Sequence, residues 1–321
     1  MLNNKTKHVY ITKKHSLATD WKVNMDTYTI ITNRIIAQLE KDIAPWRKEW
    51  SGRTPTNLVS KKPYKGINLI LLSMNEFTSN YWLTFKQAQQ LGGKIKKGST
   101  GTPVIFWKTD NYAVTVPNDS TEENAPKTKI VLKPGFLLRY YTVFNLDQCE
   151  GIKNPQVTGQ EFTPINKANI IIDNYATKPQ IVHNDGDRAF YSPARDILTM
   201  PSKNNFISPE AYYSTLFHEL THSTGHEKRL NRWKKEEVLS FGNESYSKEE
   251  LIAELGSAFL CADSGISNKT IENQTAYIRG WLKALKNDKK LIIHASAKAT
   301  RAVNYMENRI IDNFTNGKDA N

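Results

Sequence analysis

Apolar residues recur at steps of three and four along much of this chain, which is the spacing that places them on one face of a helix. The first such run begins after Asp26, ends before Pro45 and consists of Tyr28, Ile31, Ile35, Ile36 and Leu39. Similar runs predict further helices over residues 67–74, 84–91, 165–175, 248–262, 270–285 and 289–313. Ser208 and Pro209 are typical of a helix start and predict one more helix, which carries residues 218–222.

Short runs of β-type sequence lie between these predicted helices. They cover residues 103–108, 113–116, 130–132 and 137–145 in the first half, and 180–183, 189–192 and 196–200 in the second. The polar stretch 118–129 is typical of a hairpin loop or of a family-variable insertion. The mixture of helices and short strands predicts an α+β fold class.

The chain has 321 residues, more than the roughly 100–150 of a typical single domain, so we expect two domains, although one core could still hold the whole chain. Gly151 and Pro155 flank a polar segment that marks the boundary. We therefore predict a flexible arm over residues 1–25, an N-terminal α+β domain over 26–150 and a C-terminal domain over 155–321.

Charge separates the two predicted domains. Residues 1–150 contain 22 Lys and Arg against 12 Asp and Glu, a net charge of +10, whereas the remaining residues contain 22 against 20, a net charge of +2. This asymmetry indicates that the first half meets a polyanion while the second half has a different task.

The composition also favours a cytoplasmic protein. No stretch approaches the roughly 18 consecutive apolar residues that a membrane span needs, and the first twenty residues lack the apolar core of a signal peptide. The only two cysteines, Cys149 and Cys261, lie far apart and indicate neither a disulfide framework nor a cysteine-based zinc site. We expect no membrane partner.

The segment His218-Glu219-Leu220-Thr221-His222 carries the clearest chemistry. Two histidines four residues apart on a helix leave the same face and can bind one Zn²⁺. Glu219 lies beside the metal but not on it, within reach of a water that zinc activates, and can act as the general base of a peptidase. The apolar residues that precede the pair predict a buried helix, in which histidines and a glutamate need a partner such as a metal ion.

A catalytic zinc normally has a third protein ligand. His226 continues the spacing, but three ligands along one straight helix would miss a common centre, because each turn advances about 5.4 Å. Glu250 and Glu254 lie on one face of the next helix. Ser247 and Glu250 match a capping box, which gives Glu250 a structural role. We therefore predict Glu254 as the third ligand, with Glu250 as the alternative.

Two further features near the zinc segment suggest how a peptide substrate could be bound. Tyr246 is a possible donor to the oxyanion of a tetrahedral intermediate, although a packed aromatic side chain is the plainer interpretation. The strand over residues 196–200 could be the sheet edge along which an extended peptide pairs.

The basic half interleaves aromatic and cationic residues between positions 46 and 108, a pattern that suits single-stranded nucleic acid because bases stack on aromatics while cations follow phosphates. About half of these aromatics should instead build the domain core. We expect the following residues to contact nucleic acid: Arg47, Lys48, Lys61, Lys62, Lys65, Trp82, Lys94, Lys96 and Lys97.

Both halves resemble the ArdC-like antirestriction proteins of plasmids and other mobile elements. The first half is similar to their single-stranded-DNA-binding domain in the segments Ile43-Ala44-Pro45-Trp46, Pro63-Tyr64-Lys65-Gly66-Ile67-Asn68, Trp82-Leu83-Thr84-Phe85 and Tyr140-Tyr141-Thr142-Val143-Phe144-Asn145. The second half is similar to their zincin-type metallopeptidase domain in residues 218–226 with Arg229-Leu230, and in residues 249–256. The arm and the 118–129 segment have no recognisable counterpart.

The resemblance implies a protein that coats incoming single-stranded DNA during conjugative transfer and shields it from host restriction. It places zinc on His218 and His222 and catalysis on Glu219, but it does not fix the third ligand. Two alternatives stay open, namely a cytoplasmic peptidase whose basic half recognises acidic protein substrates, and a non-catalytic DNA-binding protein with a structural zinc.

Overall fold

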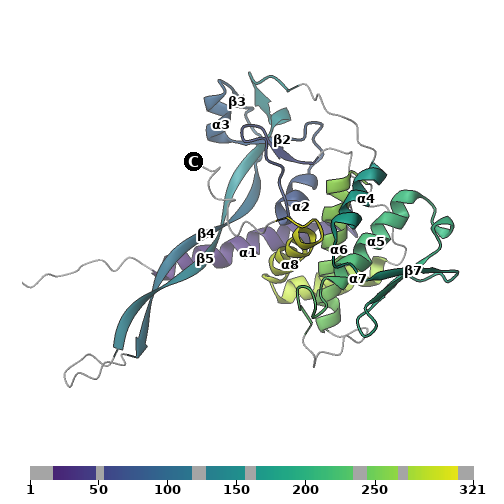
Figure 1. The fold of residues 1–321 in the computed structure, drawn as a ribbon. Coiled ribbons are helices and arrows are strands. Elements are labelled where there is room, and N and C mark those ends of the chain that lie inside the picture. The colour runs from purple at the N-terminus through teal and green to yellow at the C-terminus, as the bar shows by residue number, and fades with distance from the viewer. Residues whose placement is uncertain are drawn as a thin grey trace, which may run out of the picture.

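The chain folds into two α+β parts that pack against each other (Figure 1). The computed structural model describes residues 17–47, 54–117, 128–155, 164–233, 244–266 and 274–309. Among the helices in these ranges, none combines the length and the apolar character that crossing a membrane requires. The predicted α+β class with two domains is confirmed.

Helix α1 (Leu17–Leu39) begins nine residues before the predicted start at Asp26. No glycine or proline occurs between residues 17 and 25, so nothing in the sequence ends the helix there. The helix therefore covers residues 17–25 as well, whereas residues 1–16 lie outside the described ranges, and the flexible arm stays a prediction. The 3₁₀ helix η1 (Pro45–Arg47) follows α1.

The N-terminal sheet has four strands in the order β1-β2-β5-β4. These are β1 (Thr56–Asn57), β2 (Tyr81–Thr84), β4 (Thr102–Pro117) and β5 (Thr128–Asn145). The last two replace the four short strands predicted over residues 103–145, and they pair without a break from Thr102↔Val143 to Pro117↔Thr128. Polar residues interrupt the apolar pattern of both strands at the same level, and the backbone ladder continues through them. The resulting ribbon projects away from the rest of the protein (Figure 1).

Small elements complete this part. Helix α2 (Ile67–Ser73) lies close to its predicted range, and α3 (Phe85–Gln90) starts behind a capping box of Thr84 and Gln87. A second, two-stranded sheet pairs β3 (Lys94–Ile95) with β6 (Cys149–Glu150), which follows the 3₁₀ helix η2 (Leu146–Gln148).

The side chain of Asn68 on α2 covers the open edge of β4. Its amide nitrogen donates to the carbonyl oxygen of Ile105 at 2.7 Å, and its oxygen accepts from the Ile105 amide at 2.7 Å. These two bonds imitate a neighbouring strand and satisfy backbone groups that an edge strand would leave unpaired.

The C-terminal part surrounds a three-stranded sheet with helices. It contains α4 (Pro164–Asn174), β7 (Gln180–Asn184), β8 (Phe190–Ser192), β9 (Ile197–Pro201), the 3₁₀ helix η3 (Lys203–Asn205), α5 (Pro209–Ser223), α6 (Glu244–Ser264), α7 (Gln274–Asn287) and α8 (Leu291–Met306). The strand order is β7-β9-β8, with β9 parallel to β7 and antiparallel to β8. Strand β9 is therefore central, and the prediction that residues 196–200 form a free edge is wrong, because order along the chain does not fix order in a sheet.

One hydrophobic core runs through both parts of the protein. Trp46 of η1 is fully buried and meets Trp281 of α7 edge to face, with ring centroids 5.2 Å apart. The hydroxyl of Thr32 on α1 donates to the carbonyl oxygen of Lys289 at 2.6 Å. Helix α1 thus belongs to the packing of both parts, which the predicted boundary near residues 149–155 does not reveal.

The loop before α2 also touches the C-terminal part. Gly66 has a φ of +58° and lies against α8, where a Cβ atom on it would be 2.9 Å from the hydroxyl oxygen of Thr300. Both the left-handed backbone and the close approach require glycine at this position.

Candidate metal centre

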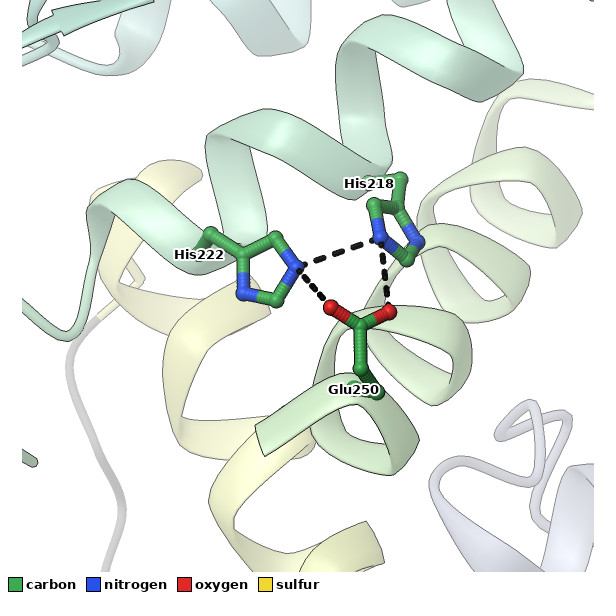
Figure 2. Close-up of side chains that lie close together, drawn as sticks. All are labelled: His218, His222 and Glu250. Atoms are coloured by element: carbon green, nitrogen blue, oxygen red, sulfur yellow. Dashed lines mark hydrogen bonds and ion pairs between the residues drawn. The ribbon is translucent and has the colours of Figure 1, made fainter. Parts of the chain in front are cut away.

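Helix α5 positions the two histidines. The hydroxyl of Ser208 accepts a hydrogen bond from the amide of Ala211 at 3.2 Å, and Pro209 occupies the first turn, so the helix starts where the sequence predicts. The motif occupies the last turns of this helix, and His218 and His222 fall one turn apart. Their Nε2 atoms lie 3.2 Å from each other (Figure 2).

Helix α6 supplies a carboxylate between the two imidazoles (Figure 2). Glu250 Oε2 lies 3.6 Å from His218 Nε2, and Glu250 Oε1 lies 3.4 Å from His222 Nε2. Each of these three residues offers one ligand atom, and the three atoms lie within 4.8 Å of one another.

The structure thus brings together His218, His222 and the alternative ligand Glu250, and it does not bring Glu254 to them. The choice of Glu254 rested on a capping box between Ser247 and Glu250. Helix α6 begins at Glu244, so Ser247 already lies inside the helix and the capping box does not form. Glu254 is buried one turn further along α6.

Close packing of α5 on α6 makes this geometry possible. A Cβ atom on Gly256 would lie only 2.5 Å from Thr221 Cγ2. A larger residue at this position would push the two helices apart, and with them the carboxylate and the histidines.

The donor atoms lie close enough together to share one metal ion. Bonds of 2.0–2.1 Å at tetrahedral angles separate neighbouring ligand atoms by about 3.3–3.4 Å. The two Nε2 atoms are 3.2 Å apart, and each lies 3.4–3.6 Å from a different oxygen of Glu250. With one donor atom taken from each residue, the three atoms lie within 4.8 Å of one another. The Nδ1 atom of His218 is buried and has no hydrogen-bond partner in the described part of the chain. A proton on this Nδ1 leaves the Nε2 lone pair available for a metal.

The electrostatic balance of the pocket also favours a cation. Burial by itself lowers the pKa of His218 and of His222. The Glu250 carboxylate raises the pKa of His218, the carboxylates of Glu249 and Glu250 raise that of His222, and the charge of Glu219 adds to both, so both values end above the usual one. Conversely, burial by itself raises the pKa of Glu250, and the two histidines hold it well below its usual range. A buried carboxylate that stays charged at neutral pH is the ligand form that a divalent cation requires.

Glu219 is held by the neighbouring sheet. Its Oε2 atom accepts a hydrogen bond from the backbone amide of Tyr191 on β8 at 2.9 Å. The Tyr191 hydroxyl donates to Asp196 at 2.7 Å, and Arg229 forms an ion pair with Asp196 at 2.8 Å. This network holds Tyr191 in place on strand β8. The Tyr191 amide in turn holds the Glu219 carboxylate beside the two histidines.

Comparison with known proteins gives the same arrangement of domains. Residues 25–144 match the N-terminal domain of anti-restriction factor ArdC, and residues 167–298 match a zincin-like metallopeptidase. The metal-free crystal structure of the antirestriction ArdC protein from the R388 plasmid is 32% identical, with a TM-score of 0.67 over 88% of this chain and 97% of that one. The chain belongs to the ArdC family.

Another crystal structure of that ArdC protein, with Mn(II) bound, has a TM-score of 0.66 and 32% identity over 89% of this chain and 98% of that one. An uncharacterized protein of Sinorhizobium fredii, y4eC, is 32% identical over 88% of this chain and 91% of its own length. A DNA primase TraC of Escherichia coli is 33% identical over 87% of this chain, which spans only 20% of that primase. The family and the donor set together support a divalent metal in this ArdC-family protein.

Glu249 and Arg232 surround the second histidine, and the sequence did not single out either of them as part of the site. Glu249 Oε1 lies 3.5 Å from His222 Nδ1 and 2.6 Å from Arg232 Nη2. Arg232 also donates to the Thr221 carbonyl oxygen at 2.9 Å and to the Thr224 hydroxyl. A carboxylate on Nδ1 orients the imidazole and leaves Nε2 for the metal. Only the fold brings these residues together, since Arg232 lies in the turn after α5 and Glu249 on α6.

We expect Glu249→Gln to weaken metal binding by about 10- to 100-fold, because the variant removes the charge that orients and polarises His222. Competition with a chromophoric chelator measures this loss. Glu227→Gln is the matched control, since Glu227 is exposed in the turn after α5. Equal metal affinity of the two variants would show that Glu249 has no positioning role.

The remaining predicted residues of the catalytic part occupy other positions. His226 is buried in the turn after α5, where its Nδ1 atom accepts from the Lys228 amide at 3.1 Å, and it does not belong to the donor cluster, as expected. Tyr246 lies in the first turns of α6, but its side chain is outside the described part of the structure.

Trp82 does not lie where a base could stack on it. Its side chain is only 2% exposed and packs with Tyr64, Leu72, Val104 and Val143 in a core of the N-terminal part. The prediction that Trp82 contacts nucleic acid is therefore wrong, because this side of β2 faces the protein interior.

The predicted lysines are exposed, as nucleic-acid contacts must be. They are Lys61, Lys62, Lys65, Lys94, Lys96 and Lys97. Of the other two predicted contacts, Lys48 and the side chain of Arg47 lie outside the described part of the structure. Exposure is necessary for phosphate contact, and the contact of the six exposed lysines with nucleic acid stays a prediction.

Lys65 differs from the other lysines because it lines a small pocket between the two parts of this ArdC-family protein. Asp263 of α6 and Arg309 after α8 line the same pocket. Burial raises the pKa of Asp263, while the charges of Arg309 and Lys65 oppose this rise. The Lys65 ammonium thus already takes part in the electrostatics of the domain contact.

Proposed function

We propose that this ArdC-family protein binds single-stranded DNA through its N-terminal part and hydrolyses peptide bonds at a zinc ion in its C-terminal part, in the cytoplasm of a cell that receives a plasmid or another mobile element. In this proposal it protects the incoming DNA from restriction. The observation that carries the catalytic half is the cluster of ligand atoms from His218, His222 and Glu250, which lie within 4.8 Å of one another, with Glu219 held beside them.

The residues around the centre suit peptide hydrolysis. A bound zinc ion supplies Lewis-acid polarisation of the scissile carbonyl and lowers the pKa of water. Glu219 can take a proton from the attacking water and transfer it to the leaving nitrogen. The Tyr191 amide keeps the Glu219 carboxylate in place during both transfers. Tyr246 remains our candidate donor to the developing oxyanion, and the substrate is a protein or peptide.

Charge supports the DNA-binding half of the proposal. The N-terminal 150 residues have a net charge of +10, from 22 Lys and Arg against 12 Asp and Glu. The six predicted lysines in the described part of the chain are exposed. Cations on such a surface displace counterions from a phosphate backbone, which makes binding strongly dependent on salt.

We expect the affinity for an oligodeoxythymidine to fall steeply with salt, by about 0.7 log units per phosphate contact for each log unit of salt. Fluorescence anisotropy across a salt series measures the slope. Glu219→Gln should bind the same oligonucleotide as the wild type does, since Glu219 is buried beside the metal centre. A flat salt response would contradict the DNA-binding half and leave the peptidase half standing.

A structural zinc is the second candidate function for the centre. The observation in its favour is that the ligands come from α5 and α6, two helices of the shared hydrophobic core, so a metal ion would tie them together. It predicts that zinc removal lowers the melting temperature while no peptide is cut under any condition.

A further inference from the structure

Part of the N-terminal sheet exposes a row of side chains on strand β5. Alternate residues of a strand point to the same face, which places Tyr140, Thr142 and Phe144 together. Tyr140 is 41% exposed, Thr142 is exposed and Phe144 is partly exposed. We call these three residues the β5 strip. Neighbouring positions in it are about 7 Å apart, because a strand rises about 3.4 Å per residue.

Protein covers the sheet on both sides of the β5 strip but not the strip itself. Towards the ribbon, Leu138 is buried in the core that includes α1, and α1 packs on β5. Towards β2, Leu83 is fully buried in a cluster with Ala88 of α3. Tyr140 and Thr142 therefore lie in a gap between two covered regions, on the same face as both.

A glycine, Gly101, lies directly against the strip. A Cβ atom on Gly101 would lie 2.2 Å from Thr142 Cγ2 and 3.1 Å from the Phe144 ring. Any other residue would collide with the strip or cover it. Phe85, which is 54% exposed, adds another accessible ring directly after β2, the strand that pairs with β5.

Cations lie at one end of the β5 strip. The loop from Lys96 to Gly101 leads into β4 and is held against the 3₁₀ helix η2, which follows β5. The Lys96 amide donates to the Gln148 carbonyl oxygen at 2.9 Å, the Gln148 side chain donates to the Thr100 carbonyl oxygen at 3.0 Å, and the Lys96 ammonium donates to the Asp147 carbonyl oxygen at 2.7 Å. Lys96 and Lys97 of this loop are exposed. The loop therefore carries positive charge beside rings that are accessible to solvent.

We propose that the β5 strip binds the bases of single-stranded DNA, with Tyr140 and Phe144 stacking on bases and Lys96 and Lys97 contacting phosphates. The inference rests on the proposed DNA-binding function and gives that function a location. Aromatic rings on an open sheet face beside lysines match the chemistry of an unpaired strand, which offers free ring faces and a charged backbone. A duplex does not fit, because its base faces are stacked inside.

The test compares variants for binding to a fluorescein-labelled oligodeoxythymidine. Tyr140→Ala is expected to lower the affinity by about tenfold with an unchanged salt slope, since stacking rather than charge is lost. Tyr140→Phe should bind as the wild type does, because the ring is kept. Lys97→Ala is expected to reduce the salt slope by about 0.7 instead. Phe190→Ala is the matched control, since Phe190 is 49% exposed on β8 of the other part.

Two substitutions of opposite charge at Thr142 test the strip without removing an aromatic ring. Thr142 is exposed, so Thr142→Glu should leave the fold intact and weaken binding, while Thr142→Lys should not. Thr128→Glu, at the far end of the same strand and exposed as well, is the matched control. If the wild type binds the oligonucleotide but Tyr140→Ala and Thr142→Glu bind as tightly, the β5 strip is not the site while the proposed function stands. If the wild type does not bind, the proposed function itself fails. Equal affinity for a duplex competitor would overturn the stacking role.

Discussion

Glu250→Gln is expected to lower zinc affinity by more than about 100-fold, whereas Glu254→Gln should leave it near the wild-type value. Losing a residue that only supports a ligand typically costs 10- to 100-fold, and losing a ligand costs more. Glu250 lies 3.4 and 3.6 Å from the two imidazoles, and Glu254 is absent from the donor cluster. Both glutamates are buried on one helix, so the pair of substitutions is matched in shape and burial.

Competition with a chelator, together with zinc content after dialysis, measures the difference. A melting curve of each variant without metal shows whether the fold is intact before zinc is added. Loss of zinc from the Glu254 variant alone would contradict the assignment of Glu250, whatever the effect on catalysis.

Glu219→Gln is expected to lower peptidase turnover by about 10²- to 10⁴-fold while zinc remains bound. This is the usual contribution of a positioned general base. Glutamine has the shape of glutamate, and its side-chain oxygen can still accept from the Tyr191 amide, which now holds Glu219 Oε2 at 2.9 Å. The variant therefore removes the base without removing a ligand.

Fluorescently labelled casein, incubated with the zinc-loaded protein in the presence and absence of oligodeoxythymidine, is a suitable general substrate for this comparison. Zinc content and oligonucleotide affinity of the variant serve as controls and should match the wild type. Equal cleavage by wild type and variant would exclude Glu219 as the base. Absence of cleavage by either protein, with a lower melting temperature after zinc removal, would favour the structural zinc.

Local sequence signals predicted most of the helices. Ser208 and Pro209 fixed the start of α5, and with it the orientation of His218 and His222, because capping chemistry acts within a few residues. The same rule failed for α6. Ser247 and Glu250 have the capping spacing, yet the helix begins at Glu244. A spacing rule cannot distinguish a cap from an interior turn when the helix extends beyond it.

Contacts between distant segments were beyond such rules. Trp46 and Trp82 fit a pattern of aromatics for base stacking, but tertiary packing buries both. The burial of Trp46 depends on Trp281 of α7, more than two hundred residues later. Likewise, Arg232 reaches Glu249 only because α5, its following turn and α6 fold together. Tyr140 lies in one of the segments that resemble the ArdC family. Its exposure became clear only once residues 128–145 were known to form one long strand, in which alternate side chains point to the same face.

The hydrophobic core that passes through both parts has a consequence for how such proteins evolve. Recombination that separated the two coding regions would leave α1 and α7 each without the partner that buries it, and would expose Trp46 and Trp281 to water. Each half therefore needs the other to bury its core residues. Consistent with this, the match to the much longer TraC primase of Escherichia coli extends over 291 residues, across both halves. A break between the two regions would therefore disturb the packing of the helices that hold the metal centre as well as that of the N-terminal part.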